Sequence, residues 1–341
     1  MADMVQAQKK IALLHRYPLE LIKETNAAFP YLEQKGIDVL TFKKFNRLGN
    51  LSKFWKSLLW IVYAPMLVAG KGYDVIYCDD SYPFYPALVK LVSPKSKVVI
   101  RLGDLHLMYY YSGIKYRILH FFEKISWIMA DNILPISEAM GAYIASEVSV
   151  DRINVVLDPI NVDDFTPLKA IKNPEKIVMF HGVITRNKNV DLLIEVAKRL
   201  PHIEFWVVGD GPDLERLKAL APENVWFAGW RPYEQMYSFI NDCTIGVALR
   251  RDNPGNEYVV TSPFLQYGIM GKPCLVTRRK VFGDYYWQFS HATELEEKIK
   301  TLMNEPKMAA SEGEKLRQYV LKNHDAKKIA EQIWNILTQQ S

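Results

Sequence analysis

Two cations lie at the start of an expected helix in the second half of the chain. Arg186 and Lys188 follow an apolar run at 177–180 and the break at Gly182, and residues spaced as on one helix face begin at Val190. The unpaired backbone N–H groups and the dipole at a helix start favour an anion, and two side-chain charges strengthen that field. The pattern predicts a diphosphate site, with solvated loop charges as the alternative interpretation.

Strands and helices alternate along the whole chain. Such alternation is typical of parallel sheets, because parallel neighbours need a crossover connection. The expected strands are 9–15, 38–42, 73–78, 97–102, 132–137, 153–158, 177–180, one directly before the glycine turn at 209–211, 225–229, 244–249 and 273–277. A polar stretch at 161–174 resembles a linker, which predicts domains at 1–165 and 175–341. The last helix, 326–337, could pack on either half.

Length and composition agree with two globular domains. The chain has 341 residues, 49% of them hydrophobic, and its net charge of +5 gives no case for duplex nucleic acid as the partner. Cys78, Cys243 and Cys274 are far apart in apolar surroundings, which predicts buried thiols in a reducing compartment. The first residues resemble no signal peptide, so we expect a cytoplasmic protein.

Two basic, aromatic stretches lie in the first half, at 42–58 and 108–130. The apolar segment that follows the first, 58–70, contains Pro65 and is shorter than the ~20 residues a spanning helix needs. The pattern favours helices lying peripherally on an anionic membrane surface. Helices that only cover the first sheet are the alternative, favoured for 58–70.

Several segments from residue 130 onward, in order and spacing, resemble GT-B glycosyltransferases of the family 4 type, a retaining group that uses nucleotide-sugar donors. The segments are ADNILPISEAM, VVLDPINVDDFTP, HGVITRNKNVDLLIEVAKRL, VVGDGPDLERL, VWFAGW and IMGKPCLVT. The resemblance covers roughly residues 130–280. It implies an α/β fold of two Rossmann-like domains facing across a cleft, with the donor held mainly by the C-terminal domain.

The resemblance also implies donor-binding positions. Lys188 matches the lysine that contacts the donor diphosphate. Val183 stands where the family has an arginine, so Arg186 would approach the phosphates from another place. Turn residues would line the nucleotide and its base, where absent side chains allow close approach; ordinary turns and packing are the alternatives. The implied donor positions are Gly182, Arg186, Lys188, Gly209, Asp210, Gly211, Gly229, Trp230, Arg231 and Gln266.

The family's two glutamates are altered here. Gln266 takes the second position, where an amide can still accept a hydrogen bond from a ribose hydroxyl. Glu257 lies one residue from the first position and would contact the transferred sugar; Glu257 and Lys188 are both catalytic candidates. Three residues of the same loop, Arg250, Arg251 and Asn253, could touch sugar or phosphate, or be solvated.

Polar residues also follow two strands of the first half. Asp79 and Asp80 follow 73–78, and Asp104 and His106 follow 97–102. Ligands of open parallel sheets bind beyond the carboxyl ends of the strands. Asp104 is our catalytic candidate here, and the other three are acceptor-side candidates, although a lone histidine is more often a packing residue.

The resemblance implies transfer of a hexose from a nucleotide-diphosphate sugar to an acceptor hydroxyl, without a metal. The first half suggests a lipid-linked saccharide as acceptor. A nucleotide-sugar epimerase of the same fold and a degenerate, non-catalytic binding partner remain open. A dehydrogenase is disfavoured, because HRYPLELIKE follows the first strand without glycines for a dinucleotide.

Overall fold

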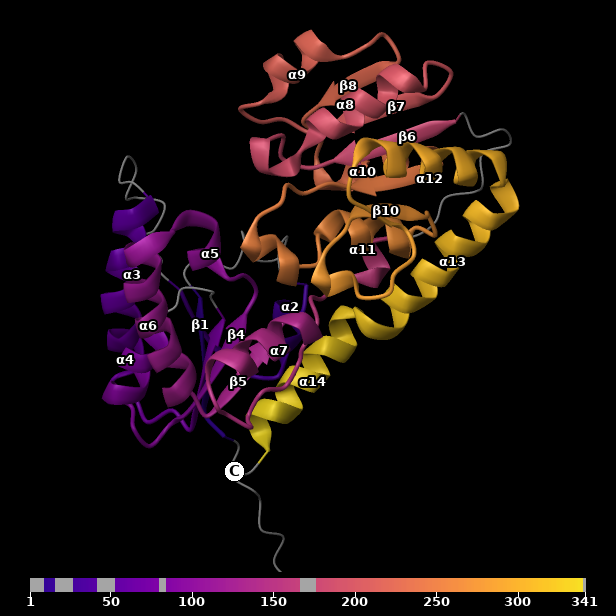
Figure 1. Cartoon of the computed structure of the whole chain (residues 1–341). Coiled ribbons are helices and arrows are strands. Elements are labelled where there is room, and N and C mark those ends of the chain that lie inside the picture. Colours follow the sequence, from indigo (N-terminus) through magenta and orange to yellow (C-terminus); the bar gives the residue numbers. More distant parts are fainter. Residues whose placement is uncertain (1–8, 16–26, 42–52, 80–83, 166–175, 340–341) are drawn as a thin grey trace, which may run out of the picture. The chain divides into compact units, whose positions relative to one another are not determined.

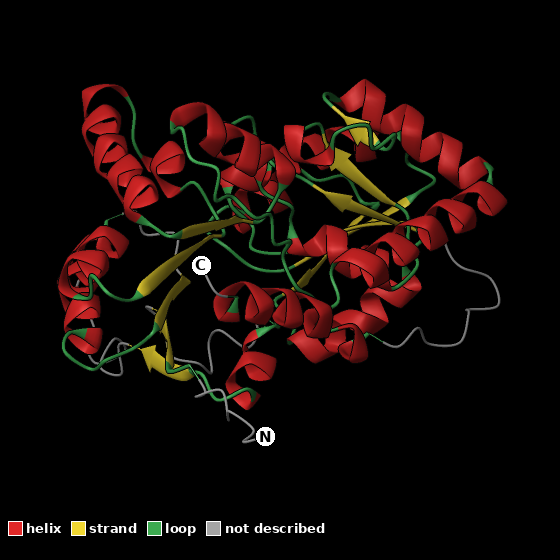
Figure 2. Cartoon of the chain, turned by 90° about the horizontal axis from the view of Figure 1, so that it is seen from below, coloured by secondary structure: helices red, strands yellow, loops and turns green. Residues whose placement is uncertain are grey.

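The computed structural model describes residues 9–15, 27–41, 53–79, 84–165 and 176–339. The chain divides into two compact units. Unit 1 comprises Met1–Pro159 and Ala326–Ser341, and unit 2 comprises Ile160–Asp325. Each unit contains one parallel β-sheet with helices on both faces (Figures 1 and 2).

Unit 1 holds a five-stranded parallel sheet in the order β2-β1-β3-β4-β5. Its strands are β1 (Ile11–His15), β2 (Asp38–Thr41), β3 (Val75–Asp79), β4 (Lys97–Leu102) and β5 (Asn132–Pro135). Its helices are α2 (Phe29–Gln34), α3 (Lys53–Val68), α4 (Tyr85–Val92), α5 (His106–Tyr110), α6 (Gly113–Met129), α7 (Glu138–Glu147) and α14 (Ala326–Thr338).

Alternate residues of β1 show how the sheet is covered. Ile11 and Leu13 pack in one core with α2 and α14, whereas Ala12 and Leu14 pack in the other with α3 and α4. Strands buried on both faces read as continuous apolar runs, which is why this sheet could be predicted. The last helix, α14, returns to unit 1, where Lys97 Nζ donates to its Ile336 carbonyl at 2.8 Å.

The separate strand predicted over 153–158 is wrong. Ile153 makes an isolated bridge to Ile133 of β5, and Val156 N donates to the Pro135 carbonyl at 2.9 Å. Pro135 has no N–H and cannot return a ladder bond to the segment. The pairing is therefore interrupted after one bridge.

Unit 2 holds a six-stranded parallel sheet in the order β11-β10-β9-β6-β7-β8. Its strands are β6 (Ile177–His181), β7 (Glu204–Val208), β8 (Val225–Gly229), β9 (Ile245–Ala248), β10 (Cys274–Thr277) and β11 (Gln288–Phe289). Its α-helices are α8 (Val190–Arg199), α9 (Leu214–Leu220), α10 (Met236–Asp242), α11 (Ser262–Ile269), α12 (Ala292–Asn304) and α13 (Pro306–Asn323). Its 3₁₀ helices are η2 (Val162–Asp164), η3 (Arg186–Lys188), η4 (Tyr233–Gln235), η5 (Pro254–Tyr258) and η6 (Lys280–Phe282).

Helices α8, α9 and α12 cover one face of the second sheet, and α10, α11 and α13 cover the other. Tyr267 fixes α11 against the strands, because its hydroxyl donates to the Met179 carbonyl at 2.8 Å. Its ring lies so close to Gly246 that a Cβ there would be 2.3 Å from a ring atom. The three cysteines, Cys78, Cys243 and Cys274, are buried, as the sequence predicts.

Candidate functional site

The carboxyl end of β6 meets two tight glycine turns. A Cβ on Gly209 would lie 2.0 Å from the carbonyl oxygen of Gly182, and Gly209 has φ +144°. A Cβ on Gly211 would lie 2.2 Å from the carbonyl oxygen of Ile184. Only glycine permits this approach. Backbone hydrogen bonds, including one of 2.8 Å from Ile184 N to the Asp210 carbonyl, hold the two loops together.

Beyond Gly182, the chain turns through η3 into α8. Asn189 between them has φ +53°, a left-handed conformation that asparagine tolerates better than most residues. Lys188 is half-buried and close enough to His181 to lower the pKa of its ring. The predicted lysine therefore lies at the start of α8, where the helix dipole favours an anion.

An arginine that the sequence analysis did not single out locks this loop. Arg216 on α9 makes bidentate ion pairs with Asp191, at 2.6 and 2.9 Å, and with Asp213, at 2.7 and 2.6 Å. The guanidinium of Arg216 lowers the pKa of both carboxyl groups. Arg186 Nε lies 3.0 Å from Asp213, and its side chain is 65% exposed. Arg186 thus pairs with a carboxylate in this structure.

The loop after β9 is joined to η3. Arg251 N donates to the Asn187 carbonyl at 2.8 Å. The Asn256 amide donates to Asn187 Oδ1 at 3.2 Å and accepts from Arg250 Nη1 at 3.1 Å. Buried Asn256 was not predicted, because its role depends on two loops far apart in sequence. Asn253 only caps its own turn, accepting from Gly255 N at 2.9 Å.

A second unpredicted cation, Arg279, follows β10. Its Nη2 donates to the Arg250 carbonyl at 2.8 Å, and its Nη1 lies 3.8 Å from Glu257. The Nε atoms of both Arg250 and Arg279 are buried and find no hydrogen-bond partner among the described residues. Cationic side chains therefore follow β6, β9 and β10 at one edge of the sheet.

The positions that match the family's two glutamates, Glu257 and Gln266, lie between β9 and β10. Glu257 lies in η5 and accepts from Lys280 N at 3.1 Å. Gln266 lies in α11 and is only 8% exposed. Gln266 is therefore shielded from solvent, and its contact with a donor stays a prediction.

The turn after β8 is exposed. Gly229 has φ +71°, a conformation that favours glycine. Trp230 is 67% exposed. The guanidinium of Arg231 lies over the Phe239 ring, 5.9 Å from its centroid. These three residues follow the strand next to β7, so they share the edge that carries Gly209.

His181, the last residue of β6, was not predicted as a site residue. It is 6% exposed, its ring is T-shaped against Tyr267 with centroids 5.0 Å apart, and its Nε2 has no partner among the described residues. Burial, with a smaller effect from Lys188, lowers the pKa of His181 from 6.5 to about 3. The imidazole is therefore neutral at physiological pH.

This pKa makes stability depend on pH. The unfolded chain binds a proton at His181 below pH ~6.5 and the folded chain only near pH 3, so acid weakens folding within that window. Between about pH 7.5 and about pH 5 we expect wild type to lose roughly 2 kcal/mol more than His181→Leu. Urea denaturation at both pH values measures this. Equal losses in the two proteins would contradict it.

In unit 1, the predicted residues lie at the carboxyl ends of β3 and β4. Asp79 is buried beside Arg101, at 3.5 Å, and Arg101 also pairs with Asp158 at 2.8 Å. Asp104 accepts a hydrogen bond of 3.4 Å from Tyr109. His106 begins α5, its ring 6.3 Å from that of Tyr110.

Asp80, the remaining acceptor-side prediction, lies outside the described residues. The sequence analysis did not single out Arg101 or Asp158: the first is inside a strand, and the second is the last residue of the segment wrongly predicted as one.

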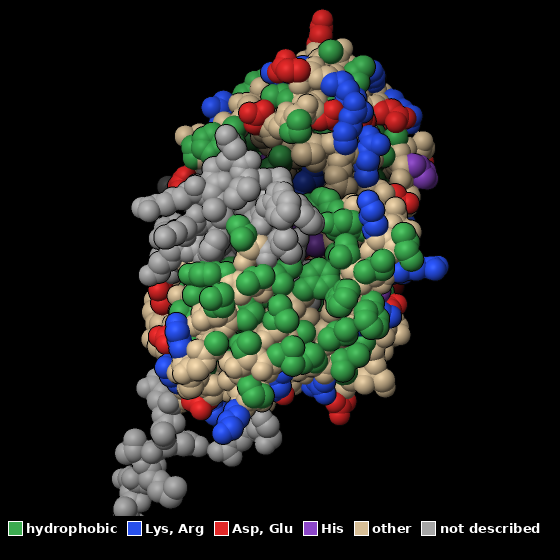
Figure 3. Space-filling model, turned by 90° about the vertical axis from the view of Figure 1, so that its left-hand side faces the viewer, with side chains coloured by type: hydrophobic (Ala, Val, Ile, Leu, Met, Phe, Trp, Pro, Cys, Tyr) green, Lys and Arg blue, Asp and Glu red, His purple; other side chains and the backbone are tan. Residues whose placement is uncertain are grey.

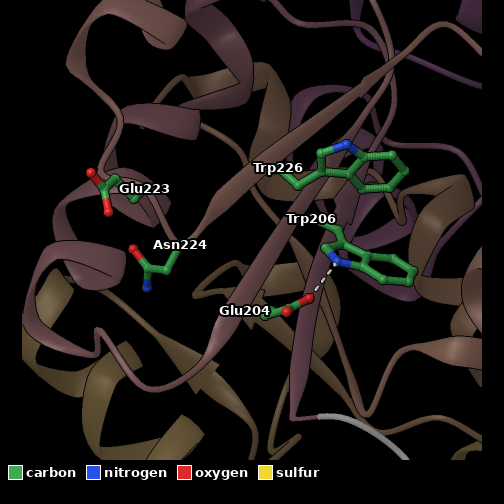
Figure 4. Close-up of a pocket in the computed structure, with 5 residues that line it drawn as sticks. All are labelled: Glu204, Trp206, Glu223, Asn224 and Trp226. Atoms are coloured by element: carbon green, nitrogen blue, oxygen red, sulfur yellow. Dashed lines mark hydrogen bonds between the residues drawn. The ribbon is translucent and has the colours of Figure 1, made fainter.

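One pocket, of about 400 Å³, lies elsewhere, at the amino ends of β7 and β8. Its lining residues are Glu204, Trp206, Glu223, Asn224 and Trp226. Figure 4 shows the two indoles together, with Trp206 Nε1 donating to Glu204 at 3.2 Å. The side-chain amide of Asn224 donates hydrogen bonds to the carbonyls of Ala197, Leu200 and Ile203. This pocket contains none of the predicted site residues.

Within the described ranges, no group of three His, Cys, Asp or Glu side chains is arranged to hold a metal ion. The expectation of a metal-free site stays a prediction.

Comparisons with known proteins bear on the fold and on the second half of the chain. A family described as glycosyl transferase-like matches residues 186–335. No curated protein matches the chain. The solved structure of sucrose-phosphate synthase from Thermosynechococcus elongatus is similar, with a TM-score of 0.75 at 16% identity over 96% of this chain and 98% of that chain.

Two further solved structures are similar over nearly their whole length. Anabaena HepE in complex with UDP has a TM-score of 0.74 at 15% identity over 96% of this chain and 99% of that one, and a second HepE structure contains UDP-glucose. The lipopolysaccharide outer core galactosyltransferase WaaB has a TM-score of 0.66 at 14% identity over 96% and 98%.

The two parallel sheets and these likenesses confirm the predicted fold class. The chain has the GT-B glycosyltransferase fold, and its residues 186–335 match a glycosyl transferase-like family.

Proposed function

We propose that the chain is a retaining glycosyltransferase, which moves a hexose from a nucleotide-diphosphate sugar to an acceptor hydroxyl. One observation carries the proposal: Lys188 lies at the start of α8, in the loop whose Gly182 packs tightly against the turn at Gly209, at the carboxyl edge of the second sheet. Ligands of open α/β sheets bind at that edge. The HepE complexes with UDP and UDP-glucose support a donor of this class.

The charge of this edge supports an anionic donor. Arg250 and Arg279 add two guanidinium groups after β9 and β10, each with a buried Nε that has no partner among the described residues. Lys188 and the α8 dipole would hold the diphosphate, and Gln266 would accept from a ribose hydroxyl. Gly182, Gly209, Asp210, Gly211, Gly229, Trp230 and Arg231 would line the donor, with Arg186 joining it on release from Asp213.

The reaction needs no protein nucleophile. The anomeric carbon loses its bond to the diphosphate oxygen and gains one to the acceptor oxygen on the same face, and the acceptor proton passes to the departing diphosphate. The second unit would hold the donor, and the first unit, with Asp79, Asp80, Asp104 and His106, would hold the acceptor. Positioning and stabilisation of the developing phosphate charge supply the catalysis, with Glu257 near the sugar.

A lipid-linked saccharide is our proposed acceptor, met at the surface of an anionic membrane by a cytoplasmic enzyme. The name of WaaB, a lipopolysaccharide galactosyltransferase, supports an acceptor that carries lipid and a hexose as the transferred group. Neither a resident metal nor a nucleic acid is part of the proposal.

A thermal-shift screen of UDP-, GDP- and ADP-sugars tests the donor. At about 100 times Kd, the matching donor should raise Tm by roughly 5–10 °C, because a ligand that binds only the folded state stabilises it. Nucleoside monophosphates, which lack the second phosphate, are the matched control and should raise Tm much less.

No shift with any nucleoside diphosphate or its sugar would refute the donor site and favour a non-catalytic partner. Release of an epimerised free nucleotide sugar would instead identify an epimerase. Retention of the anomeric configuration, read by NMR of the product, separates the proposed reaction from inverting transfer.

A further inference from the structure

Helix α6 has its polar and apolar faces reversed. Its buried residues are His120, Glu123, Ser126 and one large apolar residue, Trp127, whereas Ile114, Ile118, Phe121, Phe122 and Ile128 are exposed. A surface helix normally turns its apolar face to the core. The exposed fractions are 68% at Ile114 and 60% at Phe121.

His120 and Glu123 are paired within unit 1, whereas the buried Ser126 hydroxyl has no hydrogen-bond partner among the described residues. His120 Nδ1 lies 2.8 Å from Glu123, and its Nε2 lies 3.2 Å from Glu147 of α7. Lys124 also pairs with Glu147, at 2.7 Å, and Tyr116 stacks on the imidazole at 5.1 Å. This network and the buried ring of Trp127, which contacts Tyr143 of α7, hold α6 in place, so its exposed apolar residues are not needed for that.

Two neighbouring helices extend the exposed apolar face. Helix α4 packs against both α3 and α6. Outward residues on α3 and α4 are Leu59, Val62, Met66, Leu88, Leu91 and Val92, with 67% exposure at Met66 and 64% at Leu91. Figure 3 shows hydrophobic side chains gathered on this side of unit 1. We call the exposed apolar residues of α3, α4 and α6 the apolar face. Apolar patches this extensive mark interaction sites.

On the helices of the apolar face, the exposed charged side chains that the structure describes are cationic; the acidic Asp131 and Glu147 lie beside these helices, paired with Lys90 and Lys124. Helices α3 and α4 contain no Asp or Glu, and the one acidic residue of α6, Glu123, is buried against His120. Lys115 and Arg117 on α6 are exposed, and Tyr110, just before that helix, is 76% exposed. Apolar side chains bordered by cations and an aromatic residue suit the interface of an anionic bilayer.

We propose that the apolar face binds the surface of an anionic phospholipid bilayer. A second copy of the chain fits it less well, because pairing through this face would bring the same cations together without acidic partners. Among the described residues, no helix is long and apolar enough to cross a membrane. The contact is therefore with the interface, made by side chains of folded helices.

Vesicle flotation of the full chain, without any donor, tests this independently of the transfer reaction. Wild type should float with vesicles of phosphatidylglycerol and phosphatidylcholine and less with phosphatidylcholine alone. The double variant Ile118→Ser/Phe121→Ser should bind at least about tenfold more weakly, since two exposed apolar side chains no longer enter the interface. Lys115→Gln/Arg117→Gln should bind roughly tenfold more weakly to the anionic vesicles only.

Leu220→Ser/Met308→Ser is the matched control, because both residues are exposed apolar side chains of unit 2. It should float like wild type. Wild type remaining unbound, or equal flotation of wild type and the α6 apolar variant, would overturn the proposal. So would lipid-free dimers in sedimentation velocity that the α6 apolar variant abolishes, because they would assign the face to a second copy.

Discussion

Lys188→Ala is expected to lower kcat/KM for glycosyl transfer by roughly 100- to 1,000-fold, the usual cost of losing one group that stabilises developing charge. The lysine is half-buried at the start of α8, so its ammonium and the helix dipole act on the same phosphate oxygens. Because the diphosphate gains charge as the sugar leaves, kcat should fall as well as affinity. Steady-state kinetics with the donor found by thermal shift measure both.

Lys198→Ala is the matched control for this prediction. Lys198 lies in the last turn of the same helix and is exposed. Both variants remove one positive charge, so a general effect of net charge would lower the two rates equally. The proposal fails if Lys188→Ala keeps wild-type kinetics, or if the donor still shifts its Tm fully.

The strands of both sheets, apart from the two-residue β11, could be predicted, because parallel strands buried on both faces have continuous apolar sequences. The run Ile177–His181 is an example, and α8 after it shows the spacing of a half-buried helix. The strand expected over 153–158 was wrong for a local reason that hydrophobic periodicity does not reveal: Pro135 on the neighbouring strand has no N–H to donate.

Site residues could be predicted only where they lie close to one another along the chain. Lys188 and the glycine turn belong to adjacent strand ends, so the sequence places them near each other. Arg279 and Asn256 act through hydrogen bonds to loops 29 and 69 residues away. His181 is buried by Tyr267 from another helix. Such contacts follow from tertiary packing, which no local pattern encodes.

The orientation of α6, which exposes the apolar face, could not be predicted for a different reason. The aromatic and basic character of 108–130 is evident from the sequence, but both faces of α6 contain aromatic residues. Which face turns inward is decided by the ion pairs of His120 with Glu123 and Glu147, the last on another helix. The sequence therefore shows the aromatic and basic composition of this helix but does not indicate which of its faces is buried.

Gly209→Ala is expected to destabilise unit 2 by about 2–4 kcal/mol and to abolish donor binding. The new Cβ would lie 2.0 Å from the backbone oxygen of Gly182, and the residue would also keep φ +144°. Overpacking and a strained backbone conformation each cost about 1–3 kcal/mol. Because the obstacle is backbone, the loops before α8 and after β7 must separate, which moves the turn away from Lys188.

Scanning calorimetry and donor thermal shift together test this, with Gly70→Ala as control. Gly70 also has a positive φ, +69°, but a Cβ there meets nothing within 4 Å. The control therefore carries the conformational cost without the clash, and we expect a loss of about 1 kcal/mol with donor binding intact. If the two variants lose equal stability and both still bind donor, the close approach of the two loops does not shape the site.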